Sequence, residues 1–350
     1  MRDVDHHRHR LANGLLFILV LLGVLYTLSL AQQVLIPMVL AFLFSLVLAP
    51  SVKWLERLYL PRPVGAGIIV LVLLSVFSYG VSESVTPVSN WIDSAPAALS
   101  KIERKVYPIK KTVEAVSKTA EQVDRITSVD QKPAVKIQDG SLRGALYSNA
   151  RNLIMGTVMA IILLYFLLSW GRILLLRLAR QLHQRGSRHH FLALSEILEV
   201  EVSRYLATIT LINVCLGVVV AAVLLVVGMP NPVLWGVVAA ILNFIPYLGG
   251  LVTVVLLGAT ALLTYEGMVV PLMVIGSFIG LTIMEGQVLT PMIIGRRMAL
   301  NPLVVFLSVV FWFWLWGVLG ALMAVPILII LKLTGEQVEF LQPVSSLLGR

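Results

Sequence analysis

The chain has 350 residues, of which 58% are hydrophobic and 13% are charged, and its net charge is +9. An ordinary soluble protein is excluded, because soluble domains carry about 25% charged residues. Apolar runs recur that are long enough to cross a bilayer as helices, so we predict an all-α polytopic membrane protein with about six to eight transmembrane helices. The basic residues flank these runs, which indicates a lipid bilayer as partner and no nucleic acid.

The cysteine and histidine content excludes several kinds of site. Cys215 is the sole cysteine, so no disulfide can form within the chain and no cysteine-based metal site exists. The histidines lie outside the apolar runs, and the group at 6–9 is interpreted as part of a solvated tail. Neither an H-E-x-x-H motif nor a phosphate-binding loop occurs. We therefore predict no enzyme, no metal and no cofactor.

The N-terminal half is predicted to contain simple spans. The expected spans are 15–30, 34–50, 64–81, 152–170 and 206–227. The first is interpreted as a retained span, because no small-x-small cleavage site follows the N-terminal tail. Residues 1–82 would form a domain of three transmembrane helices. Residues 149–205 would hold the fourth helix and a basic amphipathic segment.

Charge indicates the orientation of these spans. Basic clusters precede the first span and follow the second and the fourth, which places all three on one side if the spans alternate. The positive-inside rule makes that side the cytoplasm. The N-terminus is therefore predicted to be cytoplasmic, and the charged segment 83–148 to lie outside.

That outer segment carries an apolar seam with alternating spacings of three and four residues. The seam consists of Leu99, Ile102, Val106, Ile109, Val113, Val116, Ala120 and Val123. Such spacing indicates helix pairing. Pro108 should kink or divide the helix. Two interpretations stay open: pairing with neighbouring subunits, or an amphipathic cover on the chain's own membrane domain.

The second half, 206–335, is predicted to be a transport core with two broken, re-entrant helical hairpins. The apolar run 233–265 would extend about 50 Å as one helix, well beyond the hydrocarbon core. Its centre reads "LNFIPYLGGL", where proline and glycine favour a break between two half-length helices. The run 302–331 is interrupted in the same way by Gly317 and Gly320.

The hairpin interpretation agrees with the charges. If 233–265 enters and returns to the outside, the next span, 268–284, crosses inward and places Arg296 and Arg297 in the cytoplasm. The tail 336–350 is then cytoplasmic as well. Broken helices within a membrane are tolerated where they line a cavity and often mark a transport site.

The stretch 285–302, "EGQVLTPMIIGRRMALNP", is unusually polar for its position. Glu285 is either a proton or cation site, a gate paired with one of the arginines, or an interfacial residue at a helix end. Pro291, Gly295 and Pro302 argue against one straight helix. The candidate solute-binding and gating residues are Asn243, Pro246, Tyr247, Gly249, Gly250, Glu285, Gln287, Thr290, Pro291, Arg296, Arg297 and Asn301.

The chain resembles the autoinducer-2 exporter family of bacterial membrane proteins. The resemblance is carried by "WGVVAAILNFIPYLGGLV", "EGQVLTPMIIGRRMALNPLVVFLSVVFW" and "GVLGALMAVPILIILK". "VLIPMVLAFLFSLVLAPSVKWLER" and "LSEILEVEVSRYL" extend it over essentially the whole chain. The family often has a proline where "LGG" follows Tyr247 in this sequence, and this chain has Gly250 there.

The resemblance implies a bacterial inner-membrane exporter of autoinducer-2, a molecule of quorum sensing, with re-entrant hairpins and a pentameric homo-oligomer. Relatives are implicated in Na⁺(Li⁺)/H⁺ exchange, so protons and Na⁺ are the candidate coupling ions. From the residues, and in part from this resemblance, we favour a small, uncharged, polar solute moved by alternating access. A Na⁺(Li⁺)/H⁺ antiporter and a membrane scaffold remain the alternatives.

Overall fold

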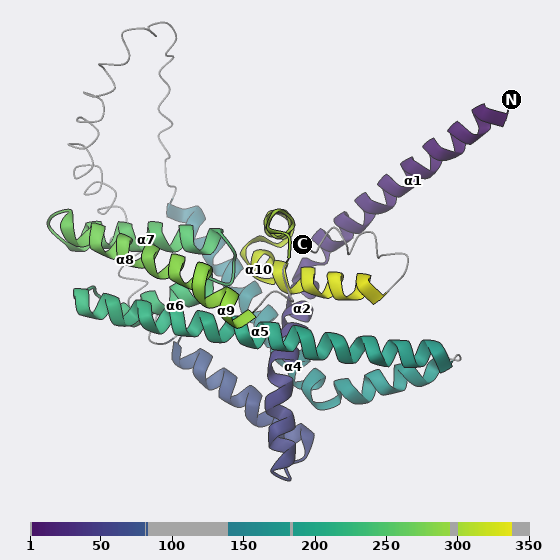
Figure 1. Ribbon diagram of the computed structural model, residues 1–350, viewed down its shortest axis with the longest axis horizontal. Helices are drawn as coiled ribbons and strands as arrows, with labels where there is room; N and C mark the ends of the chain where they lie inside the picture. Colours follow the sequence, from purple (N-terminus) through teal and green to yellow (C-terminus); the bar gives the residue numbers. More distant parts are fainter. Residues whose placement is uncertain (1, 81, 83–138, 183–184, 295–299, 338–350) are drawn as a thin grey trace, which may run out of the picture. The chain divides into compact units, whose positions relative to one another are not determined.

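A computed structural model of the chain describes residues 2–80, 82, 139–182, 185–294 and 300–337 (Figure 1). Helices account for nearly all of these residues. Six helices in the described ranges are long and apolar enough to cross a membrane. The prediction of an all-α polytopic membrane protein is confirmed. The apolar seam at 99–123 lies outside the described residues.

The helices of the first half are longer than the predicted spans. They are α1 (Arg2–Leu30), α2 (Gln32–Arg57), the helix Arg62–Gly80, α4 (Asp139–Gln181) and α5 (Arg185–Val227). The predicted amphipathic segment and the fifth span form one continuous helix, α5. The domain boundary predicted between 205 and 206 therefore falls inside a helix.

The chain divides into two compact units, and the division falls within the helix Arg62–Gly80, within α4 and within α5. One unit consists of Met1–Val72, Asn149–Thr208 and Arg296–Arg350, and the other of Leu73–Ser148 and Ile209–Gly295. The first contains α10 (Pro302–Gln337), whose apolar core is shared with α2 and α5. The indole Nε1 of Trp316 donates to the carbonyl oxygen of Leu28 at 3.1 Å, which ties α10 to α1.

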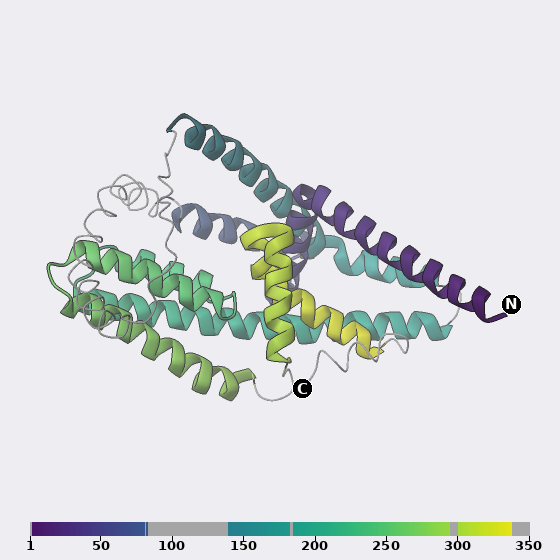
Figure 2. The ribbon, with the colours of Figure 1, turned by 90° about the horizontal axis from the view of Figure 1, so that it is seen from above.

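α10 is broken at Gly317, where φ is 64° and ψ is −147°. These angles belong to a region that glycine alone adopts readily. Figure 2 shows the two arms of α10 meeting at a sharp bend. The predicted interruption is confirmed at Gly317, whereas its re-entrant path through a membrane stays a prediction.

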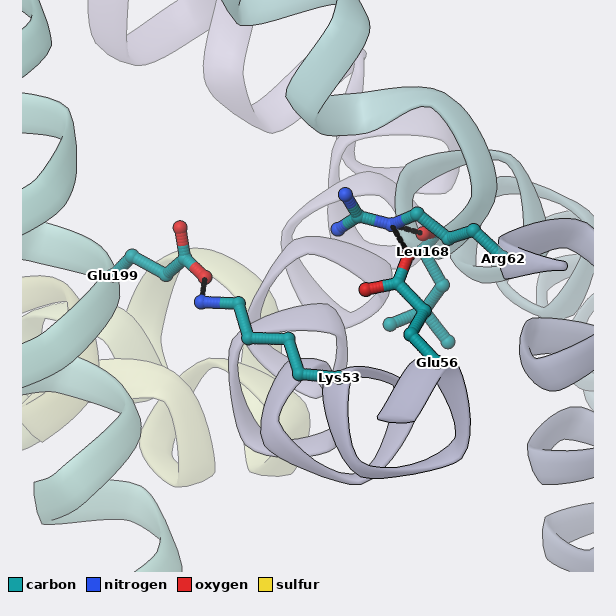
Figure 3. Close-up of polar contacts among 5 residues, drawn as sticks. All are labelled: Lys53, Glu56, Arg62, Leu168 and Glu199. Atoms are coloured by element: carbon teal, nitrogen blue, oxygen red, sulfur yellow. Dashed lines mark hydrogen bonds and ion pairs between the residues drawn. The ribbon is translucent and has the colours of Figure 1, made fainter. Parts of the chain in front are cut away.

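The first unit also has polar contacts near the end of α2 (Figure 3). Lys53 Nζ lies 2.6 Å from Glu199 Oε1 on α5. Arg62 Nε donates to the carbonyl oxygen of Leu168 at 3.0 Å and lies 3.7 Å from Glu56 Oε1. These contacts join α2 to α5, and the start of the helix Arg62–Gly80 to α2 and α4.

The second unit holds the shorter helices of the predicted transport core. They are α6 (Pro232–Leu242), α7 (Leu248–Thr264), α8 (Val269–Met284), the π-helix η1 (Glu285–Leu289) and α9 (Thr290–Ile294). α7 packs against both α6 and α8 (Figure 1). An apolar cluster that includes Leu224, Trp235, Leu257 and Val274 forms the core of this unit.

Candidate functional site

The predicted break between α6 and α7 is confirmed, and it lies at residues 243–247. The Leu248 N–H donates to the Pro246 carbonyl oxygen at 2.7 Å, and Tyr247 between them has φ 65° and ψ −48°. This is the rare form of the γ-turn, which is strained for a residue with a side chain. Strained backbone of this kind is concentrated at binding and switching sites.

The two glycines after Tyr247 have different roles. A Cβ on Gly249 would collide with the carbonyl oxygen of Leu242, so the end of α6 and the start of α7 can approach only with glycine here. A Cβ on Gly250 would meet nothing closer than Thr282 Cγ2 at 3.5 Å, an ordinary contact. The close approach of α6 and α7 therefore requires a glycine at 249. A side chain at 250 would fit without moving the turn.

Asn243, the residue that ends α6, binds a second asparagine on α5. Its Nδ2 donates to Asn213 Oδ1 at 2.9 Å. Asn213 is 0% exposed, and its own Nδ2 has no hydrogen-bond acceptor in the part of the chain that the structure describes. The sequence analysis did not identify Asn213, because a lone asparagine in an apolar run carries no signal until its partner on another helix is known.

Small residues bring α5 and α6 into close contact beside this pair. A Cβ on Gly217 would lie 2.6 Å from the Gly236 carbonyl oxygen and 2.8 Å from Ala240 Cβ, and a Cβ on Gly236 would lie 2.8 Å from Ala221 Cβ. Asn213, Gly217 and Ala221 are four residues apart and share one face of α5. The helices therefore run antiparallel, with the two asparagines at one end of the contact.

Glu285 begins the π-helix and is 7% exposed. Its Oε1 accepts a hydrogen bond from Thr290 Oγ1, and its backbone carbonyl accepts the Thr290 N–H. The helix continues past Pro291 to Ile294, and the π turn at 285–289 departs from regular α geometry just before the proline. The wider π turn accommodates the proline, whose nitrogen has no hydrogen to donate.

The remaining candidate residues lie on the π-helix, at the start of α10 or outside the described residues. Gln287 is exposed on the π-helix. Asn301 Oδ1 accepts the Leu303 N–H at 3.0 Å, so this residue caps the start of α10 in the other unit. Gly295, Arg296 and Arg297 lie outside the described residues. The predicted gate between Glu285 and the arginine pair therefore stays a prediction.

The second unit also has an apolar hollow of about 380 Å³ on α5. Its lining consists of Val218, Val219, Ala222, Val223, Val226 and Val227. Since it lacks polar groups, it suits hydrocarbon and not a polar solute. Among the described residues, no group of three or more histidine, cysteine, aspartate or glutamate side chains could hold a metal ion.

Comparison with known proteins gives one consistent result. The family model described as AI-2E family transporter matches residues 15–339. The AI-2 transport protein TqsA of Escherichia coli (strain K12) is 26% identical over 337 residues, covering 95% of this chain and 93% of that protein. YhhT of the same organism is 25% identical over 319 residues, covering 91% and 89%. MT0215 of Mycobacterium tuberculosis (strain CDC 1551 / Oshkosh) is 27% identical over 316 residues, covering 89% and 85%.

Proposed function

This chain belongs to the AI-2E family of transporters, and we propose that it exports a small, uncharged, polar solute of the autoinducer-2 type. Transport would proceed by alternating access across a bacterial inner membrane. The observation that carries the proposal is the buried Asn213–Asn243 pair at the break between α6 and α7. Broken helices with polar groups at their ends are a recurrent design of transporter binding sites.

The chemistry of this region favours an uncharged solute. No aspartate, glutamate, lysine or arginine occurs from 209 to 264. A charged solute buried there would lack a counter-charge, which is costly in a medium of low dielectric constant. Amide side chains and helix ends provide hydrogen bonds without full charges. The name of the relative TqsA supports autoinducer-2 as the first solute to test.

A second candidate function, Na⁺(Li⁺)/H⁺ exchange, is favoured by one observation. Glu285 is a buried carboxylate within a membrane-spanning helix, and its partner among the described residues is the neutral hydroxyl of Thr290. Intramembrane carboxylates without a countercharge are typical of proton and cation sites. In the exporter proposal the same residue would instead couple solute flux to a proton gradient.

Purified protein in sealed proteoliposomes distinguishes these functions. Labelled autoinducer-2 flux is measured with and without an imposed pH gradient, and sodium-dependent proton movement is followed in parallel. Glu285→Gln is compared with Glu266→Gln, since Glu266 is exposed after α7. Proton-coupled export predicts solute flux that rises with the gradient and loses this response only in Glu285→Gln. Sodium-dependent proton movement without solute flux would instead establish the exchanger.

Assembly and the scaffold alternative remain separate questions. We propose a homo-oligomer held in part by the 83–148 segment, following the heptad spacing of that segment. A scaffold would lose function when Ile102, Ile109 or Val116 becomes charged and would tolerate changes at Asn243 or Glu285. A transporter would show the reverse pattern of sensitivity.

A further inference from the structure

Asn213 is the most unusual polar group in the second unit. It lies between the buried residues Ile212 and Leu216 on α5 and is itself 0% exposed. Its carboxamide oxygen is occupied by Asn243 Nδ2, while no atom of the described residues accepts a hydrogen from its nitrogen. A buried donor without an acceptor costs free energy comparable to a lost hydrogen bond.

The surrounding backbone does not supply the acceptor. The last carbonyl groups of α6, those of Ile241 and Leu242, accept the N–H groups of Phe244 and Ile245 in the turn. Asn243 uses its backbone N–H on the Ala239 carbonyl and its side-chain amide on Asn213. These backbone groups are therefore engaged with one another, and in the described part of the second unit Asn213 Nδ2 is the buried side-chain nitrogen without a hydrogen-bond partner.

The position of Asn213 is fixed by its neighbours. One helical turn along α5, Gly217 brings the backbones of α5 and α6 together. Asn243 holds the oxygen end of the amide and so determines which way the nitrogen points. A preorganised donor of this kind binds an acceptor at a low entropic cost.

We infer that Asn213 Nδ2, which is covered in this conformation, is uncovered during transport and then binds the solute directly, by donating to a hydroxyl or carbonyl oxygen of an uncharged molecule. This inference rests on the proposed function for the solute, whereas the buried donor without a partner is observed in the structure. The N–H of Asn213 Nδ2 is a donor, so this atom binds an oxygen acceptor and not a cation. Loss of this hydrogen bond lowers affinity for the solute and leaves the helices assembled.

The first test asks whether the position is reached by water-soluble molecules, whatever the solute. Because Cys215 is the sole cysteine, Cys215→Ser gives a thiol-free background. Asn213→Cys is then treated with a charged, membrane-impermeant methanethiosulfonate, with Val220→Cys as a control in the apolar cluster. The reagent attacks thiolates, which form in wet surroundings and not in apolar ones. Both positions are buried in the structure, so modification of Asn213→Cys alone would show that its surroundings open to water, as the inference requires. No modification of it from either side overturns the inference.

The second test measures the KM and maximal rate of labelled autoinducer-2 flux. Asn213→Leu should raise KM about tenfold, the effect of losing one good hydrogen bond. Asn213→Ser, which keeps a donor, should recover part of the affinity. Asn231→Gly is the matched control, because Asn231 is exposed and has the left-handed φ of 53° that glycine adopts readily.

The outcomes separate this inference from the proposed function. Autoinducer-2 flux with an unchanged KM in Asn213→Leu overturns the inference and leaves the exporter proposal standing. No autoinducer-2 flux in the unmodified protein, with selective modification of Asn213→Cys, removes autoinducer-2 as the solute and retains the binding site. Should Asn213→Leu fail to fold, the KM of Asn213→Ser and the thiol modification decide the matter.

Discussion

Gly249 and Gly250 are adjacent in the chain and differ in what a side chain would meet. Gly249→Ala places a methyl group against the Leu242 carbonyl, which the turn can relieve only by opening. We expect it to destabilise the protein by about 1–3 kcal/mol, the usual cost of overpacking. The measurement is the midpoint of thermal unfolding in detergent, followed by tryptophan fluorescence.

Gly250→Ala is the control for that comparison. It adds a contact at 3.5 Å to Thr282 and reduces backbone freedom in the unfolded chain. Its free energy of unfolding should stay within about 0.5 kcal/mol of that of the unmodified protein or rise slightly, so its unfolding midpoint should not fall. Equal losses of stability in the two variants would mean that the α6–α7 turn is not closed as described.

Single residues divide sharply into those that the sequence reveals and those it does not. Pro246 and Gly249 could be predicted at the break because their backbone properties are local. Asn213 could not, because its significance lies in a contact with Asn243 across two helices. The Thr290 hydroxyl on Glu285 was equally hidden, since a π turn changes which side chains meet and leaves no periodic signal.

The contact between α5 and α6 depends on a small residue at Gly236. A Cβ there would collide with the Gly217 carbonyl oxygen and lie 2.8 Å from Ala221 Cβ. Gly236→Ala should therefore separate the helices and cost about 1–3 kcal/mol. It should also weaken solute binding, because Asn213 and Asn243 lie at the end of the same contact. Thermal unfolding and the KM of solute flux measure the two effects.

Gly280→Ala on α8 is the control for Gly236→Ala. Nothing lies within 4 Å of a Cβ at Gly280, and alanine in a helix interior is better than glycine by about 0.5–1 kcal/mol. It should leave the midpoint unchanged or raise it. A stable Gly236→Ala variant with unaltered flux would show that α5 and α6 do not pack at this position.

The bend in α10 predicts that residue 317 must be glycine because of its backbone conformation. A Cβ on Gly317 would meet nothing within 4 Å, so Gly317→Ala tests backbone conformation without a collision. At φ 64° and ψ −147° the substitution should cost about 1–3 kcal/mol. Gly171→Ala on α4, also without neighbours and with no positive φ, should not lower the unfolding midpoint. A straightened α10 in Gly317→Ala, with no loss of stability, would contradict the bend.

At the scale of elements, the sequence predicts interruptions better than continuity. Proline and glycine clusters revealed the breaks at 243–247 and Gly317, because both residues act through the local backbone. The continuity of α5 was missed. A basic amphipathic stretch followed by an apolar run gives the same pattern for one helix as for two, and nothing in the composition marks the absence of a turn.

For the molecule as a whole, the path of the chain through the membrane is the main prediction still to be tested. α6 has 11 residues and α7 has 17, so they extend about 16 Å and 25 Å, each less than the roughly 30 Å of hydrocarbon. Two helices too short to cross alone, joined by a tight turn, should enter and leave on the same side. Asn231 and Glu266, which flank them, are then both outside.

Thiol labelling of intact cells tests this path in the Cys215→Ser background. Asn231→Cys and Glu266→Cys should react with an impermeant maleimide, while Tyr59→Cys and Arg180→Cys should react only after permeabilisation, following the positive-inside rule. All four positions are exposed in the structure, so reactivity reports the side of the membrane. Labelling of Asn231→Cys without Glu266→Cys would mean that α6 and α7 together cross once. The Arg296–Arg297 pair would then face outward, against the charge rule that led to the hairpin, and the solute site at their turn would need a different route to water.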